Sequence, residues 1–259
     1  MPFSTALATP LSNFEANQDM KNVQDPAVTV SFPVVDSDYA LLAWTTTPWT
    51  LPSNLALCVH PDVEYVKFFD KKRNSKFLCA KPLLKGKGCL YKEDDDSVEI
   101  LEEVLGKSLV GIRYQPLFPY FASRADKAFR VVSDTYVTTD TGTGIVHQAP
   151  GHGEDDYRVC IHHKVVTNED IPCPVDDSGR FTSEVPDYQG MYIKAADPEI
   201  IKALKARGRM FADSTIFHAY PHCWRSSTPL IRKTVDSWFV RVESIKDRLI
   251  LNNQKTYWY

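Results

Sequence analysis

Residues 44–54 read WTTTPWTLPSN and directly follow the apolar run YALLA. Threonine is β-branched and suits strands, whereas Pro48 offers no N–H group to a neighbouring strand, so the stretch predicts the end of a buried strand. Successive side chains on a strand face opposite sides, so if Thr45 and Thr47 share one face, Thr46 uses the other or sits where the strand has bent. Two interpretations stay open: ordinary strand residues, or hydroxyls that face a site at the strand's end.

A second polar stretch, TGTGIVHQAPGHGEDDY, spans residues 141–157. Gly142 and Gly144 permit positive φ angles, and their N–H groups can face an anion or oxyanion. Their spacing is not the dinucleotide-binding fingerprint. His147 follows on a short apolar strand, and Asp156 lies in the acidic first turn of a short helix. Taken together with the threonines, these residues predict a small polar pocket between the two stretches.

Three chemistries could use such a pocket. A metal site could use His147, His152, Asp155 and Asp156, but these histidines lack the i, i+4 spacing of zinc proteases. A threonine nucleophile needs an adjacent base or a free N-terminal amine, and these threonines are internal. The third scheme requires the fewest special groups from the protein: a carboxylate and hydroxyl groups hold an activated ester while a bound water attacks it. We therefore expect no metal and no cofactor.

Composition sets the class of protein. The chain has 259 residues, and Lys+Arg 30 against Asp+Glu 33 gives a formal net charge of -3. The net charge therefore gives no indication that the chain binds nucleic acid. A locally basic groove could still bind it, because such a groove does not require a positive net charge. The six cysteines form no C-x-x-C pair, which favours reduced thiols over a disulfide scaffold or zinc ribbon. Without a secretory signal or an apolar run long enough for a membrane span, we expect a soluble cytoplasmic protein.

The organisation along the chain predicts a mixed fold. Short β-branched or aromatic segments bounded by Pro, Asp or Asn indicate consecutive strands from residue 28 onward. Apolar residues recur at helical spacing in 97–109 and 197–208. The expected fold class is α+β, with a barrel-like mixed β core and peripheral helices. The expected division is a connector at 1–27, the main domain at 28–215, and final strands with an outgoing helix at 216–259.

The two polar stretches also carry a family resemblance. TTTPWTLPSN together with GTGIVHQAPGHGEDDY resembles the editing domain, connective peptide 1, of isoleucyl-tRNA synthetases of the eukaryotic cytosolic type. The leucine and valine enzymes have Arg-Pro where this chain has Thr47-Pro48. The segments TPLSNFEANQ and YPHCWRSSTPLIRKTVDSWFV resemble the junctions with the synthetase core, so the likeness covers nearly the whole chain. The H-I-G-H and K-M-S-K-S signatures of the adenylation site are absent, so we expect no aminoacylation.

The resemblance implies a function and a set of roles. The domain would hydrolyse valine misattached to tRNA(Ile), and also valyl-adenylate in the full enzyme. Asp156 would bind the α-ammonium group, and His147 and Trp49 would line the side-chain pocket. Hydroxyl groups that contact the ester, the ribose or the attacking water would come from Thr45, Thr46, Thr47 and Thr50. Backbone N–H groups that bind an oxyanion would come from Gly142, Thr143 and Gly144. The implied partners are the tRNA(Ile) acceptor end and the remainder of the synthetase, with this chain a monomer.

Three other interpretations stay open. A binding module would hold the tRNA acceptor end without hydrolysing anything. A metallohydrolase would use His147, His152 and Asp156 and would be sensitive to chelators. A purely structural interpretation makes the threonines strand residues and the aspartates helix caps.

Overall fold

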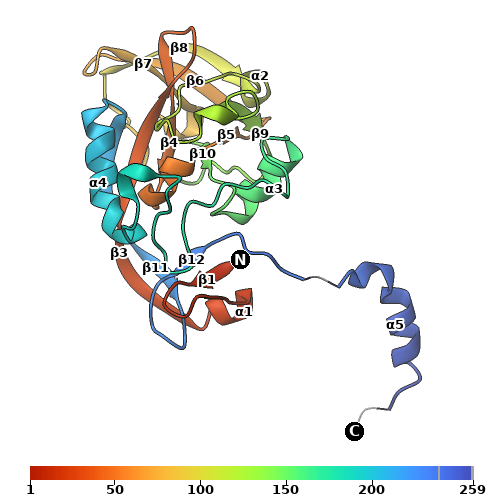
Figure 1. The fold of residues 1–259 in the computed structure, drawn as a ribbon. Helices are drawn as coiled ribbons and strands as arrows, with labels where there is room; N and C mark the ends of the chain where they lie inside the picture. The colour runs from red at the N-terminus through yellow and green to blue at the C-terminus, as the bar shows by residue number, and fades with distance from the viewer. Residues whose placement is uncertain (239, 258–259) are drawn as a thin grey trace.

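Strands dominate the architecture (Figure 1). The computed structural model describes residues 1–238 and 240–257, and within them three sheets occur, none of which closes on itself. The largest sheet has six strands in the order β11-β3-β4-β7-β6-β8. Their bounds are β3 Asp19–Pro33, β4 Tyr39–Thr45, β6 Glu64–Asp70, β7 Ser75–Ala80, β8 Val98–Leu105 and β11 Met210–His222.

Two smaller sheets complete the β structure. One has the order β10-β5-β9, the other β12-β1-β2. Their bounds are β5 Ala56–Val59, β9 Arg130–Ser133, β10 Ile145–Gln148, β1 Pro2–Ser4, β2 Thr9–Pro10 and β12 Leu230–Arg232. The pairs β4–β7 and β5–β9 are parallel, whereas the other strand pairs are antiparallel. The predicted α+β class with a mixed β core is confirmed.

Helices are few and lie at the periphery. The α-helices are α1 Asn13–Ala16, α2 Gly106–Leu109, α3 Glu154–His162, α4 Ile193–Ala206 and α5 Lys246–Asn253. The 3₁₀ helices are η1 Pro48–Ser53, η2 Lys81–Leu83, η3 Ala122–Arg124, η4 Pro186–Tyr188 and η5 Val242–Ser244. In Figure 1, α4 lies along β3, and α5 stands away from the rest of the chain. None of the helices in the described ranges is long and apolar enough to cross a membrane.

Helix α4 confirms the helix predicted from the apolar spacing at 197–208, although the helix begins four residues earlier. Its buried apolar residues Ile193, Ala196, Ile200 and Leu204 recur at helical spacing and join the main core.

The helix expected at 97–109 is wrong for most of its length. Residues Val98–Leu105 form β8, which pairs antiparallel with β6, and only Gly106–Leu109 is helical. Ile100, Leu101 and Leu105 are all exposed, so the apolar spacing forms no buried helical face. Backbone pairing with β6 decides the conformation here, because strand formation depends more on neighbours than on local pattern.

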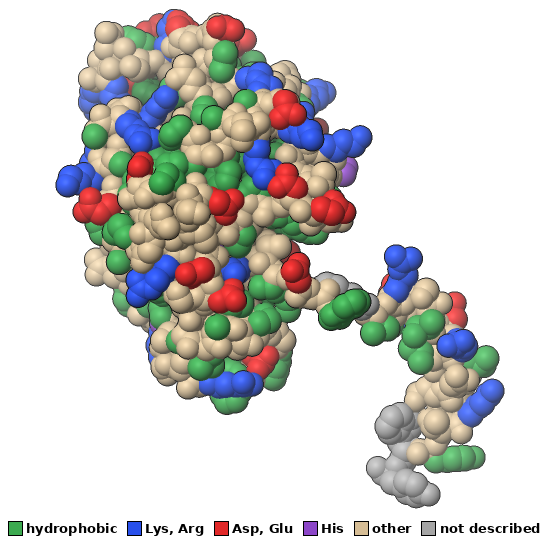
Figure 2. Space-filling model, in the orientation of Figure 1, with side chains coloured by type: hydrophobic (Ala, Val, Ile, Leu, Met, Phe, Trp, Pro, Cys, Tyr) green, Lys and Arg blue, Asp and Glu red, His purple; other side chains and the backbone are tan. Residues whose placement is uncertain are grey.

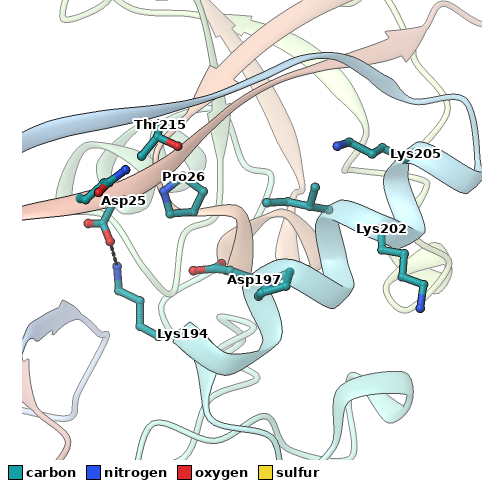
Figure 3. A pocket seen from close by; sticks show the side chains of 10 residues that line it. Asp25, Pro26, Lys194, Asp197, Lys202, Lys205 and Thr215 are labelled. Atoms are coloured by element: carbon teal, nitrogen blue, oxygen red, sulfur yellow. Dashed lines mark hydrogen bonds and ion pairs between the residues drawn. The ribbon is translucent and has the colours of Figure 1, made fainter.

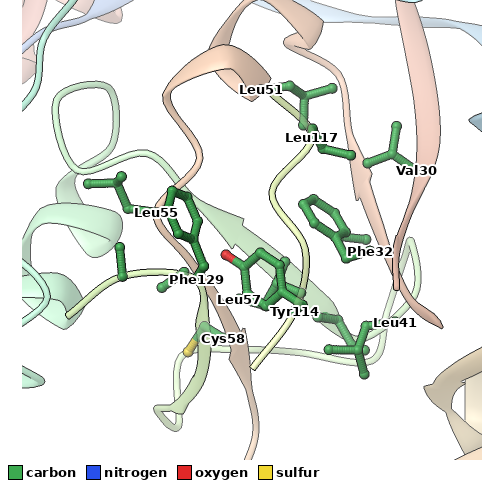
Figure 4. Close-up of a cluster of buried hydrophobic side chains, with 14 of the residues drawn as sticks. Val30, Phe32, Leu41, Leu51, Leu55, Leu57, Cys58, Tyr114, Leu117 and Phe129 are labelled. Carbon is green, nitrogen blue, oxygen red and sulfur yellow. The ribbon is translucent and has the colours of Figure 1, made fainter. Parts of the chain in front are cut away.

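The core holds the end of β4 and the loop after it in place. Leu51 and Leu55 from the loop pack with Phe32 of β3 in one buried cluster, drawn in Figure 4. Tyr114 crosses this cluster, with its ring edge-on to Phe32 at a centroid distance of 5.2 Å. Its hydroxyl donates a 2.8 Å hydrogen bond to Oδ1 of Asn54, which anchors this part of the loop to the core.

The turn before β10 packs directly against β7. Gly144 has a φ of 71°, and a Cβ placed on it would lie 2.3 Å from the Cβ of Ala80. The amide of Ala80 donates to the carbonyl of Thr143 at 2.8 Å, and the Tyr65 hydroxyl donates to the carbonyl of Gly144 at 2.7 Å. Glycine is therefore required at this position both for its backbone conformation and for the close approach of the two segments.

This packing predicts a large loss of stability for Gly144→Ala. Gly190→Ala is the matched control, because Gly190 also has a positive φ, 78°, but no atom lies within 4 Å of the methyl group that the substitution would add. We expect Gly190→Ala to lower the free energy of unfolding by about 1 kcal/mol through backbone strain, and Gly144→Ala by about 3 kcal/mol or more. Urea unfolding measures both, and equal losses would contradict the steric explanation.

Candidate active site

The threonine stretch forms a connected network of hydroxyl groups. Strand β4 ends at Thr45, and the chain then turns into η1. The Oγ1 atoms of Thr45 and Thr47 are 3.2 Å apart, and those of Thr47 and Thr50 are 3.3 Å apart. The amide of Thr47 donates to Oγ1 of Thr45 at 3.1 Å, while the Thr50 hydroxyl donates to the carbonyl of Thr47 at 2.8 Å. The hydroxyl groups of Thr45 and Thr47 thus lie together, although only Thr45 belongs to the strand.

His147 joins this network from the second polar stretch. Its Nε2 atom lies 2.8 Å from Oγ1 of Thr50, and its Nδ1 atom lies 3.5 Å from the side-chain nitrogen Nδ2 of Asn54. The amide nitrogen of Asn54 can only donate, and the single Thr50 proton is directed to the Thr47 carbonyl. His147 therefore accepts at Nδ1 and donates from Nε2. Burial lowers the pKa of His147 to about 4, so the ring is neutral at pH 7.

The threonine loop is also held from the opposite side by helix α4. The buried carboxylate of Asp197 accepts a 2.8 Å hydrogen bond from the backbone amide of Trp49. This supplies an acceptor to the first turn of η1, whose N-cap residue makes no side-chain cap of its own. Burial raises the pKa of Asp197 to about 7, opposed by the nearby Lys194 ammonium and the Trp49 amide.

A cavity of about 340 Å³ opens beside the loop. Thr47, Trp49 and Thr50 form one side of it, and His152 adds a second aromatic wall. The rings of Trp49 and His152 meet edge-on with their centroids 4.9 Å apart. The remaining lining comes from segments near the two ends of the chain, represented by Asn13, Asn17, Tyr220 and Arg232.

Asp156 lies in the first turn of α3, shortly after the carboxyl end of β10. Its Oδ2 atom accepts a 2.8 Å hydrogen bond from the amide of Ala149, two residues after His147. At the rise of an extended chain, positions 147 and 149 are separated by about 7 Å. The Asp156 side chain is partly buried, and burial raises its pKa to about 7, which the Ala149 amide opposes.

The structure does not bring all the predicted residues together. Thr46 is partly buried and lies outside the hydrogen bonds that join the hydroxyls of its neighbours. Gly142 packs against Trp44, and the carbonyls of Thr143 and Gly144 are used by β7 and Tyr65. Their part in binding an oxyanion stays a prediction.

Three contributors to the site do not follow from the sequence in these roles. The sequence suggests His152 only as a metal ligand, although it lies in the GHG turn. Tyr220 and Asp197 have no local signal, because each reaches the loop only through the fold. In the described part of the chain, no group of three or more His, Cys, Asp or Glu side chains is arranged to hold a metal ion.

A larger groove lies behind the loop, between α4 and the paired strands β3 and β11 (Figure 3). Two of its lysines are already neutralised: Lys194 pairs with Asp25 at 2.9 Å, and Lys205 pairs with Asp213 at 2.8 Å. Figure 2 likewise shows positive and negative side chains interspersed over the visible face. The cavity beside the threonine loop, with its hydroxyl and aromatic lining, is therefore the better candidate site.

The chain matches one family model along its whole length. Residues 1–259 match the model described as tRNA synthetases class I (I, L, M and V). Isoleucine–tRNA ligases from Bdellovibrio bacteriovorus and Mus musculus are each 53% identical to it over its full length. The cytoplasmic isoleucine–tRNA ligase of Caenorhabditis elegans is 52% identical. The chain spans only 24%, 20% and 22% of these three relatives, respectively.

Solved structures share the fold at low sequence identity. The crystal structure of GlLeuRS-CP1 aligns with a TM-score of 0.53 at 14% identity, covering 72% of this chain and 96% of that one. The Plasmodium falciparum cytosolic leucyl-tRNA synthetase editing domain aligns with a TM-score of 0.51 at 11% identity, covering 73% of this chain and 99% of that one. Since the family model matches every residue and the fold recurs in synthetase editing domains, the chain belongs to the class I tRNA synthetases (I, L, M and V).

Proposed function

We propose that this chain hydrolyses the ester bond of valine misattached to tRNA(Ile). One observation carries the proposal: the Thr50–His147 hydrogen bond joins the two polar stretches beside a cavity lined by hydroxyl and aromatic groups. The proposal takes isoleucine as the cognate amino acid from the names of the relatives, which are isoleucine–tRNA ligases. Several of these names also give the cytoplasm as the location of those proteins.

The need for such a site follows from the limits of size selection. A pocket shaped for isoleucine cannot strongly reject valine, which is smaller by one methylene, and isoleucyl-tRNA synthetase is itself the known example of this limit. A second site that admits valine and excludes isoleucine corrects the error. Trp49 and His152 are rigid rings in the cavity wall, so they can exclude the additional methyl group by contact, whereas His147, which was expected to share this role with Trp49, is not among the described residues that line the cavity.

Asp156 is the group proposed to hold the α-ammonium of the amino acid. Its Oδ2 atom accepts from the Ala149 amide, and we place the ammonium on the other oxygen, although Asp156 is not among the described residues that line the cavity. A carboxylate paired with an ammonium fixes orientation and supplies a charge-assisted hydrogen bond. The ammonium in turn favours the ionised form of Asp156, so the complex stabilises the charge that burial disfavours.

The hydroxyl groups are proposed to position the ester, the ribose and the attacking water. Because the Thr50 proton goes to the Thr47 carbonyl, Thr47 Oγ1 donates to Thr50 and accepts from Thr45, which leaves it one lone pair for a water or ligand proton. His147 donates from Nε2 and is neutral, so it is not the base in this arrangement. Aminoacyl esters are already activated, and positioning a water among these groups suffices for hydrolysis.

The alternative of a non-catalytic module that binds the acceptor end is a separate hypothesis. It shares the cavity and the partner but requires no turnover. Deacylation of valyl-tRNA(Ile) and isoleucyl-tRNA(Ile) by this chain, in the presence of a chelator, distinguishes the two and also tests the metal-dependent alternative.

Asp156→Asn is the first test of the assigned roles. It preserves the acceptor for the Ala149 amide but removes the charge, so we expect valyl-tRNA(Ile) deacylation to fall about 30- to 150-fold, equivalent to about 2–3 kcal/mol. Asp155→Asn is the matched control, because Asp155 is exposed and pairs with Arg158. Its turnover should remain within about twofold of the parent chain, and equal mild losses in both variants would remove Asp156 from its role.

The same substitution separates function from stability. A raised pKa means that the folded chain favours the protonated form of Asp156. The stability that this group contributes is therefore fully present below about pH 3.9 and is lost as the pH rises through about 7. Asp156→Asn is therefore expected to stabilise the folded chain at pH 8 while lowering its turnover. If urea unfolding showed lower stability with unchanged turnover, the purely structural interpretation would be favoured.

The threonines are expected to differ in importance. Thr46→Ala should lower deacylation only about two- to threefold, because Thr46 lies outside the hydroxyl network. Thr50→Val keeps the shape but removes the contacts to His147 and Thr47, so we expect about a tenfold loss. Single-turnover deacylation measures both rates. A larger loss for Thr46 than for Thr50 would contradict the proposed network.

The pH dependence should follow Asp156. We expect kcat/KM for deacylation to rise about tenfold per pH unit up to about pH 7 as the carboxylate ionises. It should fall again above about pH 8, where the substrate's α-ammonium loses its proton. The profile is measured after subtracting spontaneous hydrolysis. Asp156→Asn should lack the rising limb, and an unchanged limb would assign it to another group.

A further inference from the structure

Asp197 is an unusual residue for its place in α4. It lies one helical turn after Ile193 and one before Ile200, on the face of the helix that packs into the core, and it is only 3% exposed. A carboxyl group in such a place is unfavourable unless a hydrogen bond or an opposite charge compensates for its burial. An apolar residue would suit the packing of α4 equally well, so Asp197 calls for an explanation outside its own helix.

That explanation is the contact of Asp197 with the threonine loop. Its Oδ1 atom accepts the 2.8 Å hydrogen bond from the backbone amide of Trp49. Helix η1 begins at Pro48, which has no N–H group, so the amide of Trp49 is the first donor of that helix. Thr47, which precedes the helix, makes no side-chain cap. Asp197 therefore supplies, from a distant part of the chain, the acceptor that an N-cap residue normally supplies.

The ring of Trp49 depends on its backbone for its position. Trp49 lines the cavity of the candidate site and is 2% exposed, and its ring meets the ring of His152 edge-on. Its indole nitrogen has no hydrogen-bond partner among the described residues, so no polar contact there fixes the ring itself. Packing and the backbone that carries the ring remain. A displacement of the Trp49 amide would therefore displace the ring relative to the cavity.

The contact requires an acceptor oxygen rather than a negative charge. Burial raises the pKa of Asp197 to about 7, so the carboxyl group is only partly ionised at pH 7. The Trp49 amide needs one oxygen atom, which either form of the carboxyl group can provide. The side chain of asparagine provides the same oxygen. Leucine has the same branched shape without an oxygen, so it fills the space but cannot hold the amide.

We propose that Asp197 is a positioning residue that sets the amino-acid selectivity of the site by holding Trp49 in place. The inference rests on the proposed function, in which Trp49 excludes the additional methyl group of isoleucine. Asp197 is not among the described residues that line the cavity, so it acts through the amide of Trp49. A ring held less firmly admits isoleucine more readily and contacts valine less well, so the selectivity between the two falls.

Two substitutions of Asp197 separate the hydrogen bond from the packing. Asp197→Asn keeps an acceptor for the Trp49 amide, whereas Asp197→Leu removes it and continues the apolar face of α4. Ala203→Gly is the control for a general weakening of α4, because glycine destabilises a helix and Ala203 lies nearer its C-terminal end. Thermal unfolding establishes that each variant is folded at the temperature of the assay.

The quantity to measure is the ratio of kcat/KM for deacylation of valyl-tRNA(Ile) to that of isoleucyl-tRNA(Ile). We expect Asp197→Leu to lower this ratio about fivefold, the effect of one hydrogen bond. Asp197→Asn and Ala203→Gly should keep the ratio within about twofold of the parent chain. A purely structural role would instead lower both rates by the same factor and leave the ratio unchanged.

The proposal is overturned if Asp197→Leu keeps the ratio of the parent chain, or if the Asn and Leu variants lose it to the same degree. Should the parent chain hydrolyse neither substrate, the proposed function fails by itself, and isothermal titration calorimetry decides the inference. The probes are adenosine carrying L-valine or L-isoleucine through a non-hydrolysable 3′-amide. The preference for the valyl probe should then fall in Asp197→Leu alone, and an unchanged or absent preference would overturn the inference.

Discussion

The hydrogen bond between Thr50 and His147 is the contact on which the candidate site depends. It joins two segments that lie far apart in sequence, the loop after β4 and the strand β10. Each segment is also fixed in another way: the loop by Asp197 on α4 and by Tyr114, which holds Asn54, and the histidine by its place in β10, where it pairs with Leu57 of β5. The hydroxyl groups are therefore held by a surrounding shell rather than by their own turn alone, which is the condition for positioning a reactant accurately.

Burial gives the site an unusual electrostatic character. His147 and His152 are both neutral at pH 7, while Asp156 and Asp197 have pKa values near 7. The two histidines thus carry no charge at pH 7, each of the two carboxyl groups is about half ionised, and a bound ammonium would shift Asp156 towards its ionised form. Under the proposed function, the site would act mainly through orientation, because the ester needs little further activation.

Local chemistry in the sequence predicts only part of the fold. The strand end at Thr45, the helix after the GHG turn and the amphipathic α4 all follow from Pro, Gly and periodicity. The prediction for β8 is wrong because its pairing with β6 overrides its spacing. The one-turn helix α1 has a signal in the capping box of Ser12 and Glu15, although an extended connector is expected there. Asp197 and Tyr220 could not be predicted, because only the tertiary fold brings them to the loop.

The cavity also changes how the ends of the chain should be viewed. Residues near the two ends, such as Asn13 and Arg232, were expected to belong to connecting segments, yet they line the cavity together with Trp49. Strands β3 and β11 run continuously through both expected boundaries, at residues 27 and 215, and pair along their length. A cut at either boundary would therefore divide the lining of the cavity. The Arg232 carbonyl, which lies 3.2 Å from Nδ1 of His152, lies beyond the second of these boundaries. The candidate site is in this sense a product of the expected connecting segments as well as of the domain that carries the threonines.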